Sequence, residues 1–584
     1  MVKLRDMTAP QRIPLLQLAA FGAGGILPIA LFNIAGILVG LMGNISLGLS
    51  AFWLGVILIV PRLSDALVDP VIGHLSDNTR SRWGRRRPYL LAGGLLAAVF
   101  FVVMWWIPKG DMVRSWFPSE AGYQWFQLGY ILVTLTLFFT SVTLFEIPHG
   151  ALGMELTSDS DERTRLFSAK SFVGNLFAMS TPWLFVLANM EVFKGPGGNE
   201  ADGMRYVSLM VAGILVPLSF WWFFTLREPG FSQAARQEPT PFWQAMRRTI
   251  RNTNFILLTL TIFTLAMGFN FVQLLGSYIP IFYVFGGDKA AGATLLGING
   301  TVWAVTGLLA VFPLNWLSPR LGSRNTLVVA ISLIGLAQLS KVVCYDPAHP
   351  YLIVIPTVLL SCGMLFFFTL GSSMVGDICN EDELATGTRA EGSYYAVFWW
   401  FIKMGTALAS FISGALIVFT MFDEAQVTKV DKLQGDVREL RAQVEVLRAH
   451  GTEPADALRG KLSQTQSDAA ELLSHLQAKS SEADKTRDHY AALAQTTRDV
   501  SARLSSLPER LDTLDAELVS VQARLAPLTR QPPYTLLMMR VVEIGLPLLA
   551  CFLSLLLILR YGLTEARNRE IKELLARRHA EQAA

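Results

Sequence analysis

Apolar runs of about 20 residues recur along this chain of 584 residues and are separated by short polar segments. A run of that length is long enough for one helix to cross a lipid bilayer. The pattern predicts an all-α membrane protein with twelve transmembrane helices. They lie roughly at 15–40, 50–74, 88–107, 126–149, 167–190, 205–226, 255–285, 291–316, 325–345, 351–378, 390–421 and 535–561.

The loop charges predict how these helices are oriented. If the N-terminus is cytoplasmic, the basic segments RSRWGRRR, RQEPTPFWQAMRRTIRN, SPRLGSRN and the tail EARNREIKELLARRH all fall on the cytoplasmic side. The short loops on the other side carry little positive charge, which agrees with the enrichment of Lys and Arg in cytoplasmic loops. We expect a multi-pass protein of the bacterial inner membrane, in contact with the lipid bilayer, with both termini in the cytoplasm.

A longer polar loop at 229–254 divides the helices into six plus six. The N-terminal half is 1–228, the C-terminal half comprises 255–422 and 534–562, and a cytoplasmic tail follows at 563–584. Each half carries a related basic turn after its second helix, GHLSDNTRSRWGRRRP in the first and NWLSPRLGSRN in the second. Two six-helix halves are the arrangement of the major facilitator fold, whose substrate site lies near the midplane between the halves.

An insertion at 423–533, between the eleventh and twelfth helices, breaks the apolar pattern with a sharp rise in charge. Its Val and Leu residues at 430–447 and 500–528 alternate spacings of three and four, as the core positions of a coiled coil do. Because both ends return to one membrane face, we expect an extracytoplasmic antiparallel coiled-coil hairpin. Its tip would lie near 479–481 and its two arms, interrupted at 451–454 and Pro508, would reach about 70 Å. The first interpretation of the hairpin is a docking element that binds an envelope protein or a second copy of the chain. The other interpretation is an insertion without a role in transport.

Composition excludes several functional classes. The chain is 52% hydrophobic and 16% charged, with a mean hydropathy of +0.41, whereas soluble domains carry about 25% charged residues. A formal net charge of +3 is too small to indicate nucleic-acid binding, and the four cysteines show no metal-ligand or disulfide spacing. The sequence also lacks a Walker motif, a nucleophile elbow and a His/Cys cluster, so we expect neither an enzyme nor a cofactor other than a coupling ion.

The strongest chemical signal is a pair of acids in the second predicted span. Asp65 and Asp69 are four residues apart and therefore share one face of a helix. Such a pair can coordinate Na⁺ through its oxygens or hold a proton; ion pairing with a basic residue is the structural alternative. In the fourth span, Glu146 adds a third acid, and Thr143 lies one turn before it as a further oxygen ligand.

Basic residues in other spans are the expected partners of these acids. Lys403 lies in the apolar stretch WWFIKMG of span eleven and requires an acid or water beside it. Lys170 lies in span five, near its cytoplasmic end, where it can also extend to the lipid headgroups. Charged residues around the cytoplasmic loops form a predicted inside gate of ion pairs, with solvated loop charges as the alternative; they are Asp377, Arg389, Glu391 and Arg85.

Four sequence elements resemble one transporter family. RxxDAxxDP at 62–70, TRSRWGRRRP, TLFEIP and GDICNEDELATGTRAEGSYYAVFWWFIKMG are similar to motifs of the glycoside-pentoside-hexuronide:cation symporters, the group of the melibiose permease. The resemblance covers all twelve spans and implies that Asp65, Asp69 and Thr143 bind the coupling Na⁺, Li⁺ or H⁺. It also implies that Glu146 contributes to sugar binding and that Lys403 lies beside both sites.

The chain departs from that family at three places. Val68 stands where sodium-using members tend to have an asparagine, which favours H⁺ over Na⁺. FGAG at 21–24 lacks the acid of the galactoside transporters, and Gly150 replaces an aromatic residue of the fourth helix. Both changes remove groups that recognise a sugar, so the specificity is expected to differ from that of the melibiose permease.

The sequence therefore favours a secondary active transporter that couples uptake of a sugar or glycoside to H⁺ or Na⁺. Glu146 and Lys170 would bind the substrate, Lys403 would couple the two sites, and Asn33, Asn270 and Gln273 would add secondary contacts. The first alternative keeps the fold and changes the cargo to a lysophospholipid or another amphipathic lipid, which the apolar start of the first helix also suits. A second alternative, a scaffold or sensor without transport, is disfavoured because the acidic pair is present.

Overall fold

The computed structural model describes residues 12–31, 49, 51–109, 111–157, 159–180, 184, 187–188, 190–194, 200–228, 242–387, 390–450, 456–482, 485–506 and 511–583. The regular elements in these ranges are helices, accompanied by an isolated β-bridge between Ser81 and Gly84. Predicted sites at Asn33 and Arg389 lie outside the described residues.

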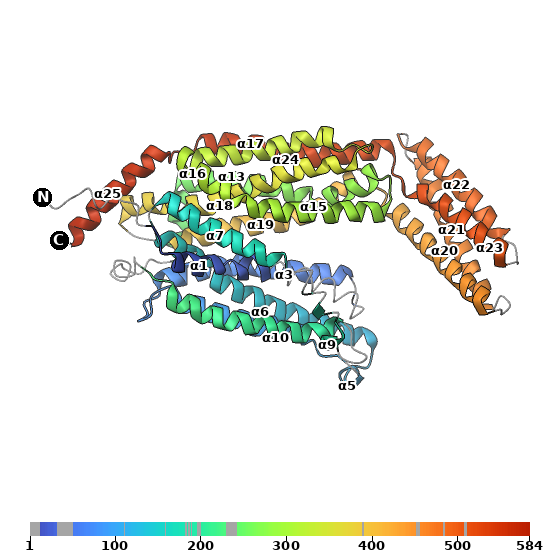
Figure 1. Ribbon diagram of the computed structural model, residues 1–584, viewed down its shortest axis with the longest axis horizontal. Coiled ribbons are helices and arrows are strands. Elements are labelled where there is room, and N and C mark those ends of the chain that lie inside the picture. The colour runs from blue at the N-terminus through green and yellow to red at the C-terminus, as the bar shows by residue number, and fades with distance from the viewer. Residues whose placement is uncertain are drawn as a thin grey trace.

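The N-terminal half is a bundle in which α3, α4, α6 and α10 pack on one another (Figure 1). Ser119 caps the long helix α6, because its hydroxyl accepts the N–H of Gly122 at 3.1 Å. The elements of this half are α1 (Leu15–Ala23), the π-helix η1 (Ile26–Leu31), α3 (Ala51–Asn78), α4 (Arg87–Trp105), α5 (Asp111–Arg114), α6 (Glu120–Glu155), α7 (Ser160–Ala178), α9 (Glu191–Lys194) and α10 (Glu200–Thr225).

The C-terminal half repeats this plan, with α17 against α18 and α13 against α24. Its elements are α12 (Phe242–Arg251), α13 (Thr253–Phe271), α14 (Gln273–Tyr278), the π-helix η2 (Ile279–Val284), α15 (Lys289–Leu309), α16 (Val311–Leu321), α17 (Ser323–Cys344), the 3-10 helix η3 (Pro350–Ile353), α18 (Val354–Thr386), α19 (Glu391–Phe419), α24 (Pro533–Leu559) and the tail helix α25 (Glu565–Ala583). The halves meet mainly where α3 packs on α19 and α7 on α18.

Seven helices in the described ranges are long and apolar enough to cross a membrane. They are α4, α6, α10, α13, α17, the helix that joins η3 to α18, and α24; an eighth crossing follows if α15 and α16, bent by 44° at their junction, form one span. The protein is thus an all-helical multi-pass membrane protein. The predicted count of twelve crossings stays a prediction.

The prediction of a two-armed hairpin for the insertion was wrong. The insertion contains four helices, α20 (Glu424–His450), α21 (Asp456–Glu482), α22 (Arg487–Ser505) and α23 (Leu511–Leu525), followed by the 3-10 helix η4 (Ala526–Thr529). These helices share one apolar core, to which Val437, Leu476, Val500 and Leu518 each contribute a buried side chain. We call α20–α23 the four-helix bundle; it lies at the opposite end of the molecule from α25 (Figure 1).

The predicted tip of the hairpin lies at the base of the four-helix bundle instead. His475 of α21 bonds to Asp423, the residue before α20, at 2.8 Å, and His489 of α22 bonds to the carbonyl of Arg530 at 3.0 Å. The connection between α21 and α22 therefore returns to the level at which the chain enters and leaves. α20 ends at His450 and α22 ends at Ser505, just before the predicted breaks. The predicted interruptions at 451–454 and Pro508 lie outside the described residues. Because α20 packs against α21 and α22 against α23, the reach is about 40 Å, as expected for helices of 27 residues.

Candidate functional site

The acidic pair meets Lys403 where the two halves touch. Asp65 and Asp69 project from one face of α3 and are 1% and 0% exposed. The Nζ atom of Lys403, on α19, lies 2.9 Å from a carboxylate oxygen of Asp69 and 3.6 Å from one of Asp65. Thr143 of α6 completes the group, with its hydroxyl 3.4 Å from both Nζ and Asp65. Three helices from both halves thus bring four polar groups to one buried point.

The charges of this group do not balance by themselves. One ammonium faces two carboxylates, and an uncompensated charge inside a membrane protein is expensive. The ammonium of Lys403 stands among the same oxygens that would hold a coupling cation, namely those of Asp65, Asp69 and Thr143. A cation or proton that binds the carboxylates therefore competes with Lys403 for them.

A second polar pair adjoins the acidic pair. Glu146 follows Thr143 by one turn of α6, and its carboxylate lies 4.0 Å from the Nζ atom of Lys170 on α7. Lys170 also donates a hydrogen bond of 3.4 Å to the hydroxyl of Tyr395 on α19. Glu146 and Lys170 are 9% and 5% exposed, so both are buried between the halves. The sequence did not single out Tyr395, although GSYYAVFWW carries it.

Of the remaining predicted contact residues, Asn270 has a described side-chain contact, and it lies within its own helix. The side-chain amide of Asn270 donates to the carbonyl of Ala266 on its own helix at 2.8 Å. Gln273 begins α14, one turn further along the chain. Their roles, and that of Asn33, stay predictions.

Two ion-pair clusters join the halves beyond the site. In the first, Arg85 contacts Glu155 at 2.6 Å and Glu391 of the other half at 3.1 Å. Arg86 contacts Glu155 at 2.6 Å and Asp77 at 2.8 Å, and all five side chains are 8% exposed or less. The carboxylates around Arg86 raise the pKa of its guanidinium despite its burial.

The second cluster holds Asp377, another of the predicted gate residues. Asp377 of α18 pairs with Arg163 of α7, and it accepts a hydrogen bond of 3.1 Å from Ser160. Thus Arg85 and Glu391 share one cluster and Asp377 lies in the other, and the partners Arg86, Glu155, Asp77 and Arg163 were not predicted. The feature of the sequence that could have identified these partners is their charge together with their position next to the basic loops.

The tail helix α25 bridges the halves at the same end. Lys572 lies 3.1 Å from Asp159 of the N-terminal half, and Arg578 donates to the carbonyl of Leu384 of the C-terminal half at 3.1 Å. Ile571 on the inner face of α25 is buried. We call this end of the molecule, with its two ion-pair clusters and α25, the closed end.

Asp161 lies beside this bridge, ahead of the fifth predicted span. Burial, together with the negative charges of Asp159 and Glu565, raises the pKa of the Asp161 carboxyl to about 6. Its charge therefore changes near neutral pH, at the place where α25 meets α7.

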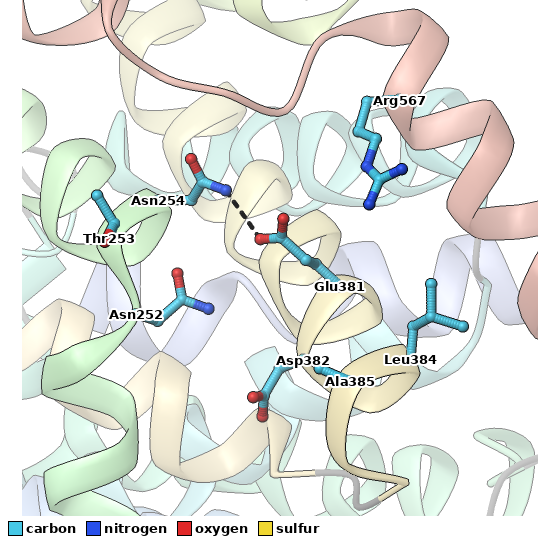
Figure 2. Close-up of a pocket in the computed structure, with 8 residues that line it drawn as sticks. All are labelled: Asn252, Thr253, Asn254, Glu381, Asp382, Leu384, Ala385 and Arg567. Carbon is cyan, nitrogen blue, oxygen red and sulfur yellow. Dashed lines mark hydrogen bonds between the residues drawn. The ribbon is translucent and has the colours of Figure 1, made fainter.

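A pocket of about 520 Å³ opens beside α25 (Figure 2). In it, Asn254 donates a hydrogen bond of 2.8 Å to Glu381, as the dashed line in Figure 2 shows. The pocket is lined by Asn252, Thr253, Asn254, Glu381, Asp382, Leu384, Ala385 and Arg567. None of these is a predicted site residue, so the pocket belongs to the closed end rather than to the buried site.

Comparison with known proteins decides the family. Residues 20–446, more than half of the chain, match the family described as MFS/sugar transport protein. The chain belongs to this MFS/sugar transport family. Its relatives are transporters, so it is a transporter and not an enzyme, as predicted, and the resemblance to cation symporters is confirmed.

Two relatives illustrate the breadth of this MFS/sugar transport family. The isoprimeverose transporter of Lactiplantibacillus pentosus is 26% identical over 371 residues, 63% of this chain and 73% of the relative. The putative glycoside/cation symporter YagG of Escherichia coli strain K12 is 24% identical over 389 residues, 64% and 76% of the two chains. A bacterial homologue of the iron transporter ferroportin, solved in an outward-facing state, has a similar fold, with a TM-score of 0.55 and 13% identity over 69% of this chain and 93% of that one.

Proposed function

We propose that this protein couples uptake of a sugar or glycoside to H⁺ or Na⁺ by alternating access. The observation that carries the proposal is the shared position of Lys403, which pairs with the acids of α3 and lies beside Thr143. A cation that binds Asp65 and Asp69 displaces the ammonium, which then becomes available to the neighbouring Glu146. The relatives named as sugar transporters and glycoside/cation symporters support this cargo and this coupling.

Glu146 and Lys170 would bind substrate hydroxyl groups. A carboxylate accepts hydrogen bonds from hydroxyls and an ammonium donates to them, so the pair can hold neighbouring hydroxyls of a sugar ring. Filling both sites replaces the ion pairs by ligand contacts, which leaves the site without the unpaired charge that would oppose rearrangement of the halves. Coupling is then obligatory, because binding of the cation alone or of the sugar alone leaves the charges of the other site unpaired.

The closed end would be the cytoplasmic gate. Glu391 and Asp377 from one half pair with Arg85 and Arg163 from the other, and these contacts have to break before the site can open at this end. Basic loops at the same end agree with a cytoplasmic location. The four-helix bundle, at the opposite end in Figure 1, would then be extracytoplasmic, with twelve helices crossing the inner membrane. Docking of an envelope protein or self-association is the role predicted for it.

The test is uptake by the purified full chain in proteoliposomes, with imposed H⁺ or Na⁺ gradients and with sugars and lysophospholipids offered in parallel. We expect uptake of a sugar driven by one of the gradients, and its loss in Asp69→Asn. Asp346→Asn is the matched control, because Asp346 lies in a loop and contacts His349 there. Transport of lipid without any response to sugars would refute the assignment of a sugar as the cargo. Unchanged uptake in Asp69→Asn would refute the assignment of Asp69 to the cation site.

A further inference from the structure

Tyr395 fills a space that Gly150 leaves between the halves. Its ring, on α19, is fully buried. A Cβ atom at position 150 of α6 would lie 2.1 Å from Cε1 of this ring and 2.2 Å from Cζ, far inside van der Waals contact. Gly150 has an ordinary helical backbone, so the position needs glycine for space and not for its conformation. The ring of Tyr395 can occupy this position only because residue 150 has no side chain.

The contact lies between the buried site and the closed end. Along α19, Tyr395 is eight residues from Lys403 and four from Glu391. At 1.5 Å per residue these are distances of about 12 Å and about 6 Å along the helix axis. On α6, Gly150 likewise lies between Thr143 and Glu155. The ring therefore separates the site from the first ion-pair cluster.

The hydroxyl of Tyr395 reaches the site from this position. It accepts a hydrogen bond from Lys170 at 3.4 Å, and the ammonium also lies 5.8 Å from the centre of the ring. Lys170 belongs to the N-terminal half and Tyr395 to the C-terminal half. Any separation of α19 from α6 that lifts the ring off Gly150 also takes the hydroxyl away from Lys170.

We propose that Tyr395 is a positioning residue that links closure of the site to its affinity for substrate. While the ring of Tyr395 lies on Gly150, it blocks the path from the buried site to the closed end, and its hydroxyl holds Lys170 in position to bind the substrate. When the halves part at this end, Lys170 loses its hydrogen bond to Tyr395 while it retains its ion pair with Glu146, so affinity falls as the exit opens. The part played by Lys170 rests on the proposed function, whereas closure by the ring does not.

Closure is tested with Gly150→Ala and its matched control Gly129→Ala. Both glycines lie on α6, but a Cβ at Gly129 meets nothing within 4 Å. Spin labels at Leu75 and Leu321, which are 50% and 39% exposed on α3 and α16, report the distance between the halves in the full chain in nanodiscs. Overpacking costs about 1–3 kcal/mol, so we expect Gly150→Ala to raise the ratio of the wider to the narrower separation by roughly 5- to 150-fold. Gly129→Ala should match the wild type, and wild-type distances in Gly150→Ala would overturn closure by Tyr395.

Positioning is tested with Tyr395→Phe, which keeps the ring and removes the hydroxyl. A hydrogen bond is worth about 0.5–1.5 kcal/mol net, so KM for uptake should rise roughly 2- to 10-fold. The maximal rate, and the ratio of the wider to the narrower label separation, should stay within about twofold of wild type. An unchanged KM would overturn the positioning role. A wild-type protein that takes up no sugar would overturn the proposed function, while the distances in Gly150→Ala still decide closure.

Discussion

Asp77 of the N-terminal half is bound to the start of α19 in the C-terminal half. Its carboxylate accepts the backbone N–H groups of Gly392 at 3.0 Å and Ser393 at 2.8 Å, and the hydroxyl of Ser393 at 2.8 Å. An acidic side chain at a helix N-terminus satisfies free N–H groups and interacts favourably with the helix dipole. Asp77 therefore caps a helix of the opposite half, and these three bonds exist only while the closed end is closed.

The expected effect of Asp77→Ala follows from these bonds. Loss of a capping side chain costs about 0.5–2 kcal/mol, and each hydrogen bond to a charged group is worth about 1.5–3 kcal/mol. When the halves separate, hydrogen bonds to water compensate for part of this free energy, and Arg86 keeps its contact with Glu155. We expect a net loss of about 2–4 kcal/mol for the closed arrangement, which lowers the ratio of closed to open molecules by about 30- to 700-fold.

The assay is the distance between spin labels at Leu75 and Leu321 in nanodiscs. Asp77→Ala should move the distribution toward the wider separation, and Asp77→Asn should have a smaller effect because the amide keeps an acceptor oxygen. Asp346→Ala, in an exposed loop, serves as the control. A wild-type distribution in Asp77→Ala would refute the reasoning, since it would mean that capping across the halves does not stabilise closure.

Three further outcomes are expected. Lys403→Gln should reduce gradient-driven uptake about 100-fold or more, because breaking a buried ion pair costs about 3–5 kcal/mol; wild-type initial rates would contradict this. Because the pKa of Asp161 is raised, docking of α25 should be strongest below the ordinary aspartate pKa near 4 and should weaken as pH rises through about 6. A spin label at Ala576 should become more mobile over that pH range in the wild type and show no such change in Asp161→Asn. A carbodiimide should join Lys429 to Glu471, which form an ion pair between α20 and α21, whereas in a two-armed hairpin they would lie about 60 Å apart along one arm; absence of this product by mass spectrometry would contradict the four-helix bundle.

The four-helix bundle shows where prediction from a repeat pattern ends. The heptad-like spacing identified the apolar residues that become buried, such as Val437 and Leu518. It also predicted interruptions at 451–454 and Pro508, next to the residues at which α20 and α22 end. It could not tell a kink from a reversal, because both begin with the same loss of helical hydrogen bonds. The reversals are favoured in the folded chain because they let each helix bury its apolar face against two neighbours.

The contacts between the buried acids and Lys403 were predicted more completely than those of the predicted gate residues. Spacing alone put Asp65 and Asp69 on one helix face, and the cost of a charge in a membrane required a partner for Lys403. The predicted gate residues Asp377, Glu391 and Arg85 were identified from their charge, but their partners were not. Several Arg and Glu residues with similar local surroundings lie near the same loops, and only the approach of the two halves selects among them.

The sequence by itself determined the class of the protein, because lengths of apolar sequence and the sidedness of charge depend on the bilayer and not on packing. It also determined which buried acids and bases need partners. Only the tertiary structure decided that Lys403 faces both acids, that Asp77 caps a helix of the other half, and that Tyr395 lies on Gly150. These contacts join residues that are more than 200 positions apart. Their geometry depends on how whole helices pack, which no local pattern of residues encodes.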